Sequence, residues 1–247
     1  MSADVVYPPL DVPKPVAEDV WIVDSGPQTV FGVLHLPVRM TVLRLADGRL
    51  WLHAPTRWRS VLVDALEDLG RIRHLVAPNG AHWTHLFGWH NACPSALVWA
   101  APGVARKLRR ARQPVPIHAE LGDAPPGDWA GQIEQAAFRG RGGFTEIAFF
   151  HRASGTLVLA DTAQALEPAR LDPPTRLFAR AVGATRGETP AHLRRVLGGA
   201  AHRAANRAAA ECLLAWAPRR VILAHGAWFR DDAPARLERA FAWLLRG

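Results

Sequence analysis

The sequence predicts a single α/β domain, and three observations lead to that prediction. Short aliphatic runs bounded by Gly, Pro or Asp recur up to residue 161 and are typical of buried strands. Stretches of helical length dominate after residue 161, with one late strand among them. The 247 residues are 49% hydrophobic and 21% charged, which is enough apolar material for one extensive core.

The predicted elements run from strands to helices along the chain. Residues 1–17 are Pro-rich and are expected to form an extended N-terminal arm, so the domain itself is expected to span residues 18–247. Asp47-Gly48 between two alternating runs predicts a hairpin, and Thr189-Pro190 predicts a helix start with Thr189 as the N-cap. The predicted strands are 20–24, 38–45, 49–53, 72–77, 96–100, 133–138, 146–151, 156–160 and 220–224. The predicted helices are 60–69, one opened by 101–103 and ending near 112, 191–197, 200–216 and a closing helix that starts at 232–234.

Charge and composition exclude several classes of protein. The net charge is +8, but the basic residues are nearly all Arg and are scattered, and no nucleic-acid-binding module accompanies them. We therefore expect no nucleic-acid partner. No run approaches the apolar length of a membrane span and the N-terminus lacks a secretory pattern, so we expect a cytoplasmic protein with no membrane partner. The two cysteines, Cys93 and Cys212, are too few for a disulfide framework or a thiolate zinc site.

Three predicted strands each lead to a side chain that can bind a metal. His82 follows the strand over 72–77, Asp161 follows the run that ends at 160, and His225 follows the run that ends at 224. In α/β sheets, ligands collect at the carboxyl ends of strands. Two imidazoles and a carboxylate form a mixed nitrogen and oxygen set that suits a divalent metal. The sequence therefore predicts that these three side chains converge.

Several short segments, taken with the order of the elements, carry a family resemblance. They are Arg39-Met40-Thr41-Val42, Ala77-Pro78-Asn79 with His82, Trp89 with Pro94, Phe149-Phe150-His151 with Ser154 and Thr156-Leu157, and Ala224-His225-Gly226. This arrangement resembles the metallo-β-lactamase fold, an αββα sandwich. More closely, it is similar to an uncharacterised bacterial and plant family of metallo-β-lactamase-like proteins, known only as a domain of unknown function. The resemblance covers roughly residues 18–246.

The resemblance also implies where metal ligands would lie. The superfamily's site is built from a loop written H-x-H-x-D-H, a His from a third segment, an Asp after one strand and a His after another. His82, Asp161 and His225 match three ligands of its second metal position, and the stretch 138–143 offers no third-segment His. The residues at the other loop positions are Ala77, Asn79 and Ala81, and His53-Ala54-Pro55 replaces an early Asp-x-Gly. A hydrolase with the ordinary two-metal centre is therefore not expected.

Two functions stay open on this reduced ligand set. In one, His82, Asp161 and His225 hold a single divalent metal (zinc, iron or manganese) in a hydrolase of unknown substrate. In the other, which is equally compatible with the sequence, the protein binds no metal, is non-catalytic and holds an unknown small molecule. Nothing in the sequence indicates the oligomeric state.

Further residues are expected around the same pocket. They are Asn79, His85, Arg39, Trp83 and Trp228. His85 lies three positions after His82 and is a second candidate ligand, although a His among Trp and Phe is more often a packed or capping residue. Without a metal, we expect Asp161 to contact at least one of His82, His225 and Arg39, because a buried carboxylate needs a partner.

Overall fold

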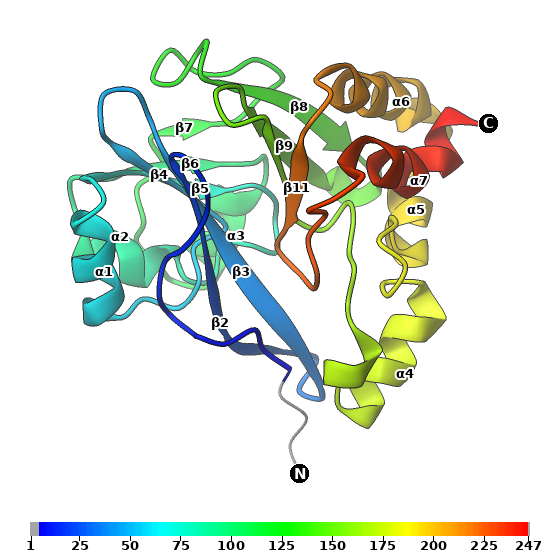
Figure 1. Ribbon diagram of the computed structural model, residues 1–247, viewed down its shortest axis with the longest axis horizontal. Coiled ribbons are helices and arrows are strands. Elements are labelled where there is room, and N and C mark those ends of the chain that lie inside the picture. The colour runs from blue at the N-terminus through cyan, green and yellow to red at the C-terminus, as the bar shows by residue number, and fades with distance from the viewer. Residues whose placement is uncertain (1–4, 247) are drawn as a thin grey trace.

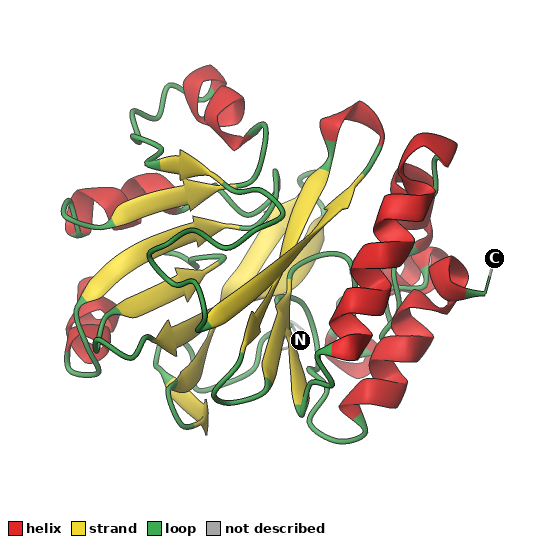
Figure 2. Cartoon of the chain, turned by 90° about the horizontal axis from the view of Figure 1, so that it is seen from above, coloured by secondary structure: helices red, strands yellow, loops and turns green. Residues whose placement is uncertain are grey.

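Two β-sheets face each other and carry helices on their outer sides, which gives an αββα sandwich in a single domain (Figures 1 and 2). The computed structural model describes residues 5–246. Within them, the first sheet contains β1 Lys14–Ala17, β2 Val20–Val30, β3 Leu34–Arg44, β4 Leu50–His53, β5 Ile72–Ala77, β6 Leu97–Ala100 and β7 Ala119–Glu120, in that order. The second sheet contains β11 Arg220–Leu223, β10 Thr156–Leu159, β9 Thr145–His151 and β8 Ile133–Arg139, in that order.

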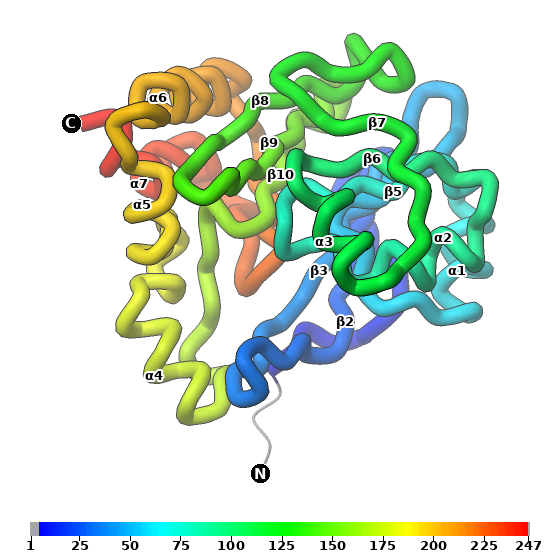
Figure 3. Tube along the Cα trace, turned by 180° about the vertical axis from the view of Figure 1, so that it is seen from behind, coloured from blue at the N-terminus to red at the C-terminus, as the bar shows by residue number. Residues whose placement is uncertain are grey.

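The helices form two groups on opposite sides of the sheets, as the view from behind shows (Figure 3). The helices beside the first sheet are α1 Ser60–Glu67, α2 Leu86–Ala92 and α3 Val104–Arg110. The helices of the C-terminal part are α4 Pro173–Val182, α5 Ala191–Leu197, α6 Ala200–Ala215 and α7 Ala233–Leu245. Of these, α6 packs on β8 and α7 on β11, whereas α4 contacts β3. No helix within residues 5–246 has both the length and the apolar character needed to cross a membrane.

Strand β4 shows how the sequence produces these layers. Successive side chains of a strand point to opposite faces. Leu50 and Leu52 therefore pack into the cluster with α1–α3, whereas Trp51 packs into the cluster between the two sheets. There the Trp51 ring meets the edge of Phe149 from the second sheet at a centroid distance of 4.8 Å. Full burial of an apolar side chain such as Phe149 stabilises the fold by about 1.5–3 kcal/mol, so these contacts hold the sheets together.

Each predicted strand is present in the structure, and the α/β sandwich is confirmed. The first two strands are longer than predicted, and β1, β7, α2 and α4 were not predicted. Residues 14–17 of the expected arm form β1, which pairs with β2, and residues 1–4 lie outside the described part of the chain. The N-cap assignment was wrong, because Pro190 occupies that position and the Thr189 hydroxyl donates to the carbonyl of Ala240 in α7.

Candidate metal centre

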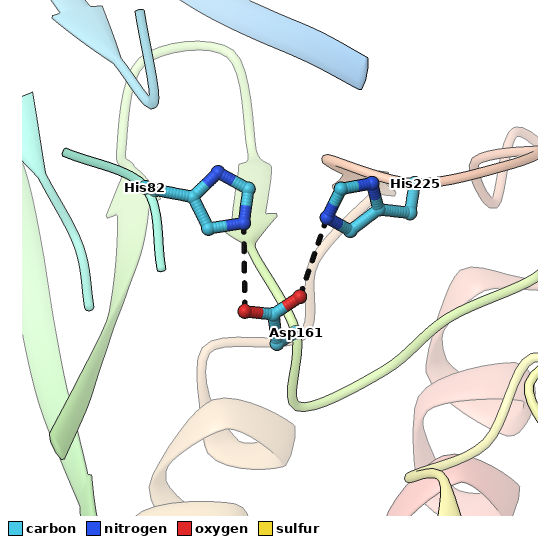
Figure 4. A group of neighbouring side chains, drawn as sticks. All are labelled: His82, Asp161 and His225. Atoms are coloured by element: carbon cyan, nitrogen blue, oxygen red, sulfur yellow. Dashed lines mark ion pairs between the residues drawn. The ribbon is translucent and has the colours of Figure 1, made fainter. Parts of the chain in front are cut away.

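His82, Asp161 and His225 converge at one edge of the sandwich (Figure 4). The last paired residues of the parallel strands β10 and β11 are Leu159 and Leu223. Asp161 and His225 each follow two positions later, so the two strands deliver them side by side. The loop after β5 brings His82 to the same place, and one ligand atom from each residue lies within 4.8 Å of those of the other two. The expected convergence is therefore present.

The two imidazoles face different oxygens of the same carboxylate (Figure 4). His82 Nε2 lies 3.5 Å from Asp161 Oδ2, and His225 Nε2 lies 3.3 Å from Asp161 Oδ1. Both distances exceed the usual range for a hydrogen bond between nitrogen and oxygen, about 2.7–3.2 Å. Each distance is close to the separation of about 3.4 Å between two ligand atoms of a tetrahedral ion with bonds of about 2.1 Å, and the two contacts use different oxygens of the carboxylate. The spacing therefore suits a cation.

The tautomer of His225 is fixed by the backbone of β3. Its Nδ1 lies 2.7 Å from the carbonyl oxygen of Pro37, which can only accept, so Nδ1 carries the proton and donates. In a neutral ring, Nε2 then presents a lone pair toward Asp161 Oδ1, which is itself an acceptor. A cation between the two atoms, or a second proton on the imidazole, would remove the repulsion between the two lone pairs. A His that donates its other ring nitrogen to a carbonyl is the usual arrangement of a metal ligand.

Arg39 supports the loop that carries His225. Its NH1 donates to the carbonyls of Leu223, at 2.9 Å, and Gly226, at 2.6 Å, which lie on either side of His225. Gly226 has a φ of +84°, and a Cβ there would lie 2.1 Å from the carbonyl oxygen of Ala165, so the turn requires glycine. Arg39 forms its ion pair with Asp24, at 2.8 Å. Of the three partners expected for Asp161, the two histidines are those in contact with it.

Asn79 connects Asp161 to the His82 loop. Its Nδ2 donates to Asp161 Oδ2 and to Glu146 Oε2, both at 2.8 Å. Its Oδ1 accepts from the backbone N–H of Ala81, at 2.7 Å, and of His82, at 3.2 Å. The amide of this fully buried side chain is thus occupied on both sides. Asn79 therefore positions two candidate ligands and is not itself free to act as a third.

Glu146 is the part of the site that the sequence analysis missed. This buried residue of β9 accepts from the backbone N–H groups of Ala160, Asp161 and Thr162, and from the Thr162 hydroxyl at 2.6 Å. Burial and the nearby charge of Asp161 raise the pKa of Glu146. A signal was available, because Glu146 is the single charged residue within the largely apolar run 144–150. Its carboxylate fixes the turn from which Asp161 projects.

The electrostatics favour an ionised Asp161. Burial alone raises the pKa of this carboxyl, but His82 and His225 outweigh burial and hold the pKa well below its usual range. For His82 the directions are reversed. Burial lowers its pKa, but the charges of Asp161 and Glu146 raise it, and the net pKa lies above the usual value for a histidine. Gln164 Nε2 adds a neutral donor to Asp161 Oδ1 at 3.1 Å. A permanent negative charge therefore lies between two imidazoles.

The centre opens into a cavity of about 280 Å³. Apolar side chains line much of it, among them Leu36 of β3, Phe144, Phe178 of α4 and Leu193 of α5. His192 also reaches its wall, whereas no Lys or Arg within residues 5–246 does. We call this space the apolar cavity. Its lining suits an uncharged, largely apolar group.

Four of the five residues expected around this pocket lie elsewhere, namely His85, Trp83, Trp228 and Arg39. His85 lines a separate hollow with Arg57 and Arg59, so it is not placed beside the other candidate ligands. Trp83 packs against the core cluster between the first sheet and α1–α3. Trp228 lines a different cavity together with Arg39, because the Gly226 turn directs the chain away from the centre.

The fold places the protein in a defined structural class, the metallo-β-lactamase fold. The DIM-1 metallo-β-lactamase exposed to ceftazidime is 16% identical, with a TM-score of 0.62 over 94% of this chain and 95% of that one. A metallo-β-lactamase from Erythrobacter litoralis, with β-mercaptoethanol in its active site, is 14% identical, with a TM-score of 0.64 over 98% and 100%. The Flv1 flavodiiron core from Synechocystis sp. PCC6803 is 12% identical, with a TM-score of 0.63 over 98% of this chain and 61% of that one. At such identities the similarity shows the fold alone.

The sequence itself identifies the family. Residues 17–178 match the model of the family described as Domain of unknown function (DUF4336), and the chain belongs to that family. The matched segment includes His82 and Asp161 and ends before His225. No curated protein matches the chain.

Proposed function

We propose that the protein is a single-metal hydrolase in which His82, Asp161 and His225 hold one divalent ion. The observation that carries this proposal is the His225 ring. Its Nδ1 donates to the Pro37 carbonyl, so that its Nε2 lone pair faces Asp161 Oδ1 at 3.3 Å. A three-ligand set leaves coordination positions for water and substrate, as in catalytic zinc sites.

The neighbouring residues favour one ion over two. Ala77 and Ala81 carry no donor atom in their side chains, and the Asn79 amide is already bonded to four partners. The positions that would complete a first metal site are therefore apolar or occupied. The second site keeps its three ligands, with Asn79 and Gln164 donating to the carboxylate and fixing its orientation.

The cavity supplies the remaining chemistry. A divalent ion in the site would lower the pKa of water and polarise a carbonyl or phosphoryl oxygen. Burial lowers the pKa of His192, which keeps its ring neutral near pH 7 and able to accept a proton from a reacting group in the cavity. The side chains of Leu36, Phe144 and Phe178 would bind an apolar part of the substrate and exclude water.

Metal analysis of protein purified without a polyhistidine tag tests the proposal. We expect close to one equivalent of zinc, iron or manganese per chain, and a loss of most of it in His82→Ala and His225→Ala. The matched control is His85→Ala, which removes an imidazole from the neighbouring hollow and should leave the metal content unchanged. Sub-stoichiometric metal in the wild-type protein, even after dialysis against each ion, would contradict the proposal.

A second function is supported by a different observation. Asp161 already has four partners in the structure, namely His82, His225, Asn79 and Gln164, so its charge is compensated without an ion. In that case the apolar cavity would bind a neutral small molecule without catalysis. Binding of a fluorescent apolar probe in the presence of a chelator would favour this function. Binding that requires added metal would favour the first.

A further inference from the structure

A second and larger cavity lies beside the loop that follows His225. Its volume is about 500 Å³, within the range of about 300–1,000 Å³ that is usual for small-molecule sites. It shares no lining residue with the apolar cavity. Its walls come from the N-terminal segment with β1 and β2, from Arg39 of β3, from residues 167–170 and from residues 227–230. We call it the basic cavity.

The charges in its wall are predominantly positive. Lys14, Arg39, Arg170 and Arg230 line the basic cavity, against two acidic residues, Asp24 and Glu167. Asp24 is shared by two of the cations, with Lys14 Nζ at 2.5 Å and Arg39 NH2 at 2.8 Å. The basic side chains therefore outnumber the carboxylates that could neutralise them, and the cavity favours an anion.

One of these cations has an unused donor. Arg39 is 3% exposed, and its Nε is buried with no hydrogen-bond partner among residues 5–246. A buried donor without an acceptor costs about 1–3 kcal/mol. Because that nitrogen is itself buried, an anion in the cavity would meet the more exposed guanidinium groups of Arg170 and Arg230. Guanidinium groups also present their N–H donors in a plane, which suits carboxylate and phosphate oxygens.

The cavity also has aromatic walls. The Tyr7 ring lies under the guanidinium groups of Arg39, at 5.2 Å, and Arg170, at 4.7 Å from its centroid. The guanidinium of Arg230 lies 4.5 Å from the centroid of the Trp228 ring. Stacking of this kind holds a guanidinium flat while its edge stays available to an anion. The edges of these rings and the outer faces of the stacked guanidinium groups suit a planar group of a ligand.

We propose that the basic cavity binds a small phosphate ester that carries a planar ring, the chemistry of a nucleoside monophosphate or an aryl phosphate. Arg170 and Arg230 contact the anion and Trp228 packs against the ring. The site communicates with the candidate metal centre, because Arg39 also donates to the two carbonyls that flank His225. Binding itself does not depend on a metal at His225, so its test is independent of the proposed hydrolase.

Calorimetric titration of the full-length protein with adenosine monophosphate and with phenyl phosphate tests the site. We expect saturable binding of both. Adenosine and inorganic phosphate should each bind at least tenfold more weakly, because adenosine lacks the phosphate and inorganic phosphate lacks the ring. Arg170→Gln and Arg230→Gln should each weaken binding at least tenfold. Both side chains are exposed over a large part of their surface, so the variants are expected to fold. Unchanged circular dichroism and melting confirm that.

The matched control is Lys107→Gln, which removes a basic side chain from a separate hollow beside Gly80 and should leave both affinities unchanged. No saturable binding by the wild-type protein at millimolar ligand would overturn the proposal. Equal losses in Lys107→Gln and Arg230→Gln would do the same, because they would indicate non-specific attraction to a basic protein. Equal affinity for inorganic phosphate and phenyl phosphate would remove the assigned role of the ring.

Discussion

Asn79, in the loop after β5, and Glu146 of β9 are joined by a buried hydrogen bond of 2.8 Å from Asn79 Nδ2 to Glu146 Oε2. The second hydrogen of the same nitrogen bonds Asp161 Oδ2, also at 2.8 Å. One neutral amide therefore separates two carboxylates in the interior. This explains why an asparagine suits this position in a chain that keeps Asp161.

Asn79→Asp should be strongly destabilising. The change replaces a donor to two carboxylates by a third acid, which either adds a buried negative charge or takes up a proton. We expect a loss of about 3 kcal/mol or more in the free energy of unfolding at pH 7, measured by urea titration. The control is Asn91→Asp on the exposed side of α2, which should leave the midpoint almost unchanged. Similar midpoints for the two variants would show that the Asn79 bonds contribute little.

Asp161→Asn distinguishes the two functions considered for the site. If the site holds a metal, the neutral amide should reduce zinc affinity by at least an order of magnitude, because it removes the anionic ligand. If the site holds none, the variant should fold with equal or greater stability, since a buried charge is lost. The control is Asp172→Asn. Asp172 pairs with His35, at a distance of 3.1 Å between Oδ2 and Nδ1, and does not belong to the candidate centre. Competition against a chelating dye measures the affinity.

The tautomer of His225 can be observed directly. In zinc-loaded protein labelled with ¹⁵N, we expect Nδ1 to keep its proton, since it donates to the Pro37 carbonyl, and the Nε2 resonance to shift on addition of zinc. His118, whose ring packs edge-on against Trp99, should show no change with zinc. A His225 ring that loses its Nδ1 proton, or that ignores zinc, would argue against its role as a ligand.

The triad could be predicted from the sequence because three apolar runs lead to it. Parallel pairing of β10 with β11 then brings Asp161 and His225 together. Glu146 was missed because its partners, the N–H groups of residues 160–162, lie in the turn after the next strand, β10, and the sequence alone does not show that they meet Glu146. Trp228 is only three positions after His225, but the chain turns at Gly226 between them. Trp228 therefore lines the other cavity, which the sequence did not indicate.

The missed elements have local causes. Helix α4 begins with Pro173-Pro174, which suggests a loop, although proline is tolerated in the first turn of a helix. Asp172 caps this helix by accepting from the backbone N–H of Thr175 at 3.0 Å. Helix α2 is short and contains Gly88, and β7 has two residues, so neither has a periodic pattern of useful length.

The last prediction concerns acid stability and rests on His53, at the end of β4. Burial lowers the pKa of His53 to about 3, and neither ring nitrogen has a hydrogen-bond partner among the described residues. In the unfolded chain a histidine has a pKa of about 6.5. Between these values the unfolded state binds a proton that the folded state does not, so stability is complete above pH 6.5 and falls as the pH decreases toward 3.

His53→Phe should therefore reduce this pH dependence. The ring keeps its contacts with Trp51 and Phe149, while the group that titrates is removed. Each such proton changes the free energy of unfolding by about 1.4 kcal/mol per pH unit well below pH 6.5, so between pH 8 and pH 5 the wild-type protein should lose about 2 kcal/mol more than the variant. Urea titrations of both proteins, with chelator present, at pH 8, 6.5 and 5 measure the difference. At pH 8 the comparison reports packing alone, and burial lowers the pKa of His74 to about 4 in both proteins, so its contribution cancels. Parallel pH profiles for the two proteins would show that His53 is protonated in the fold.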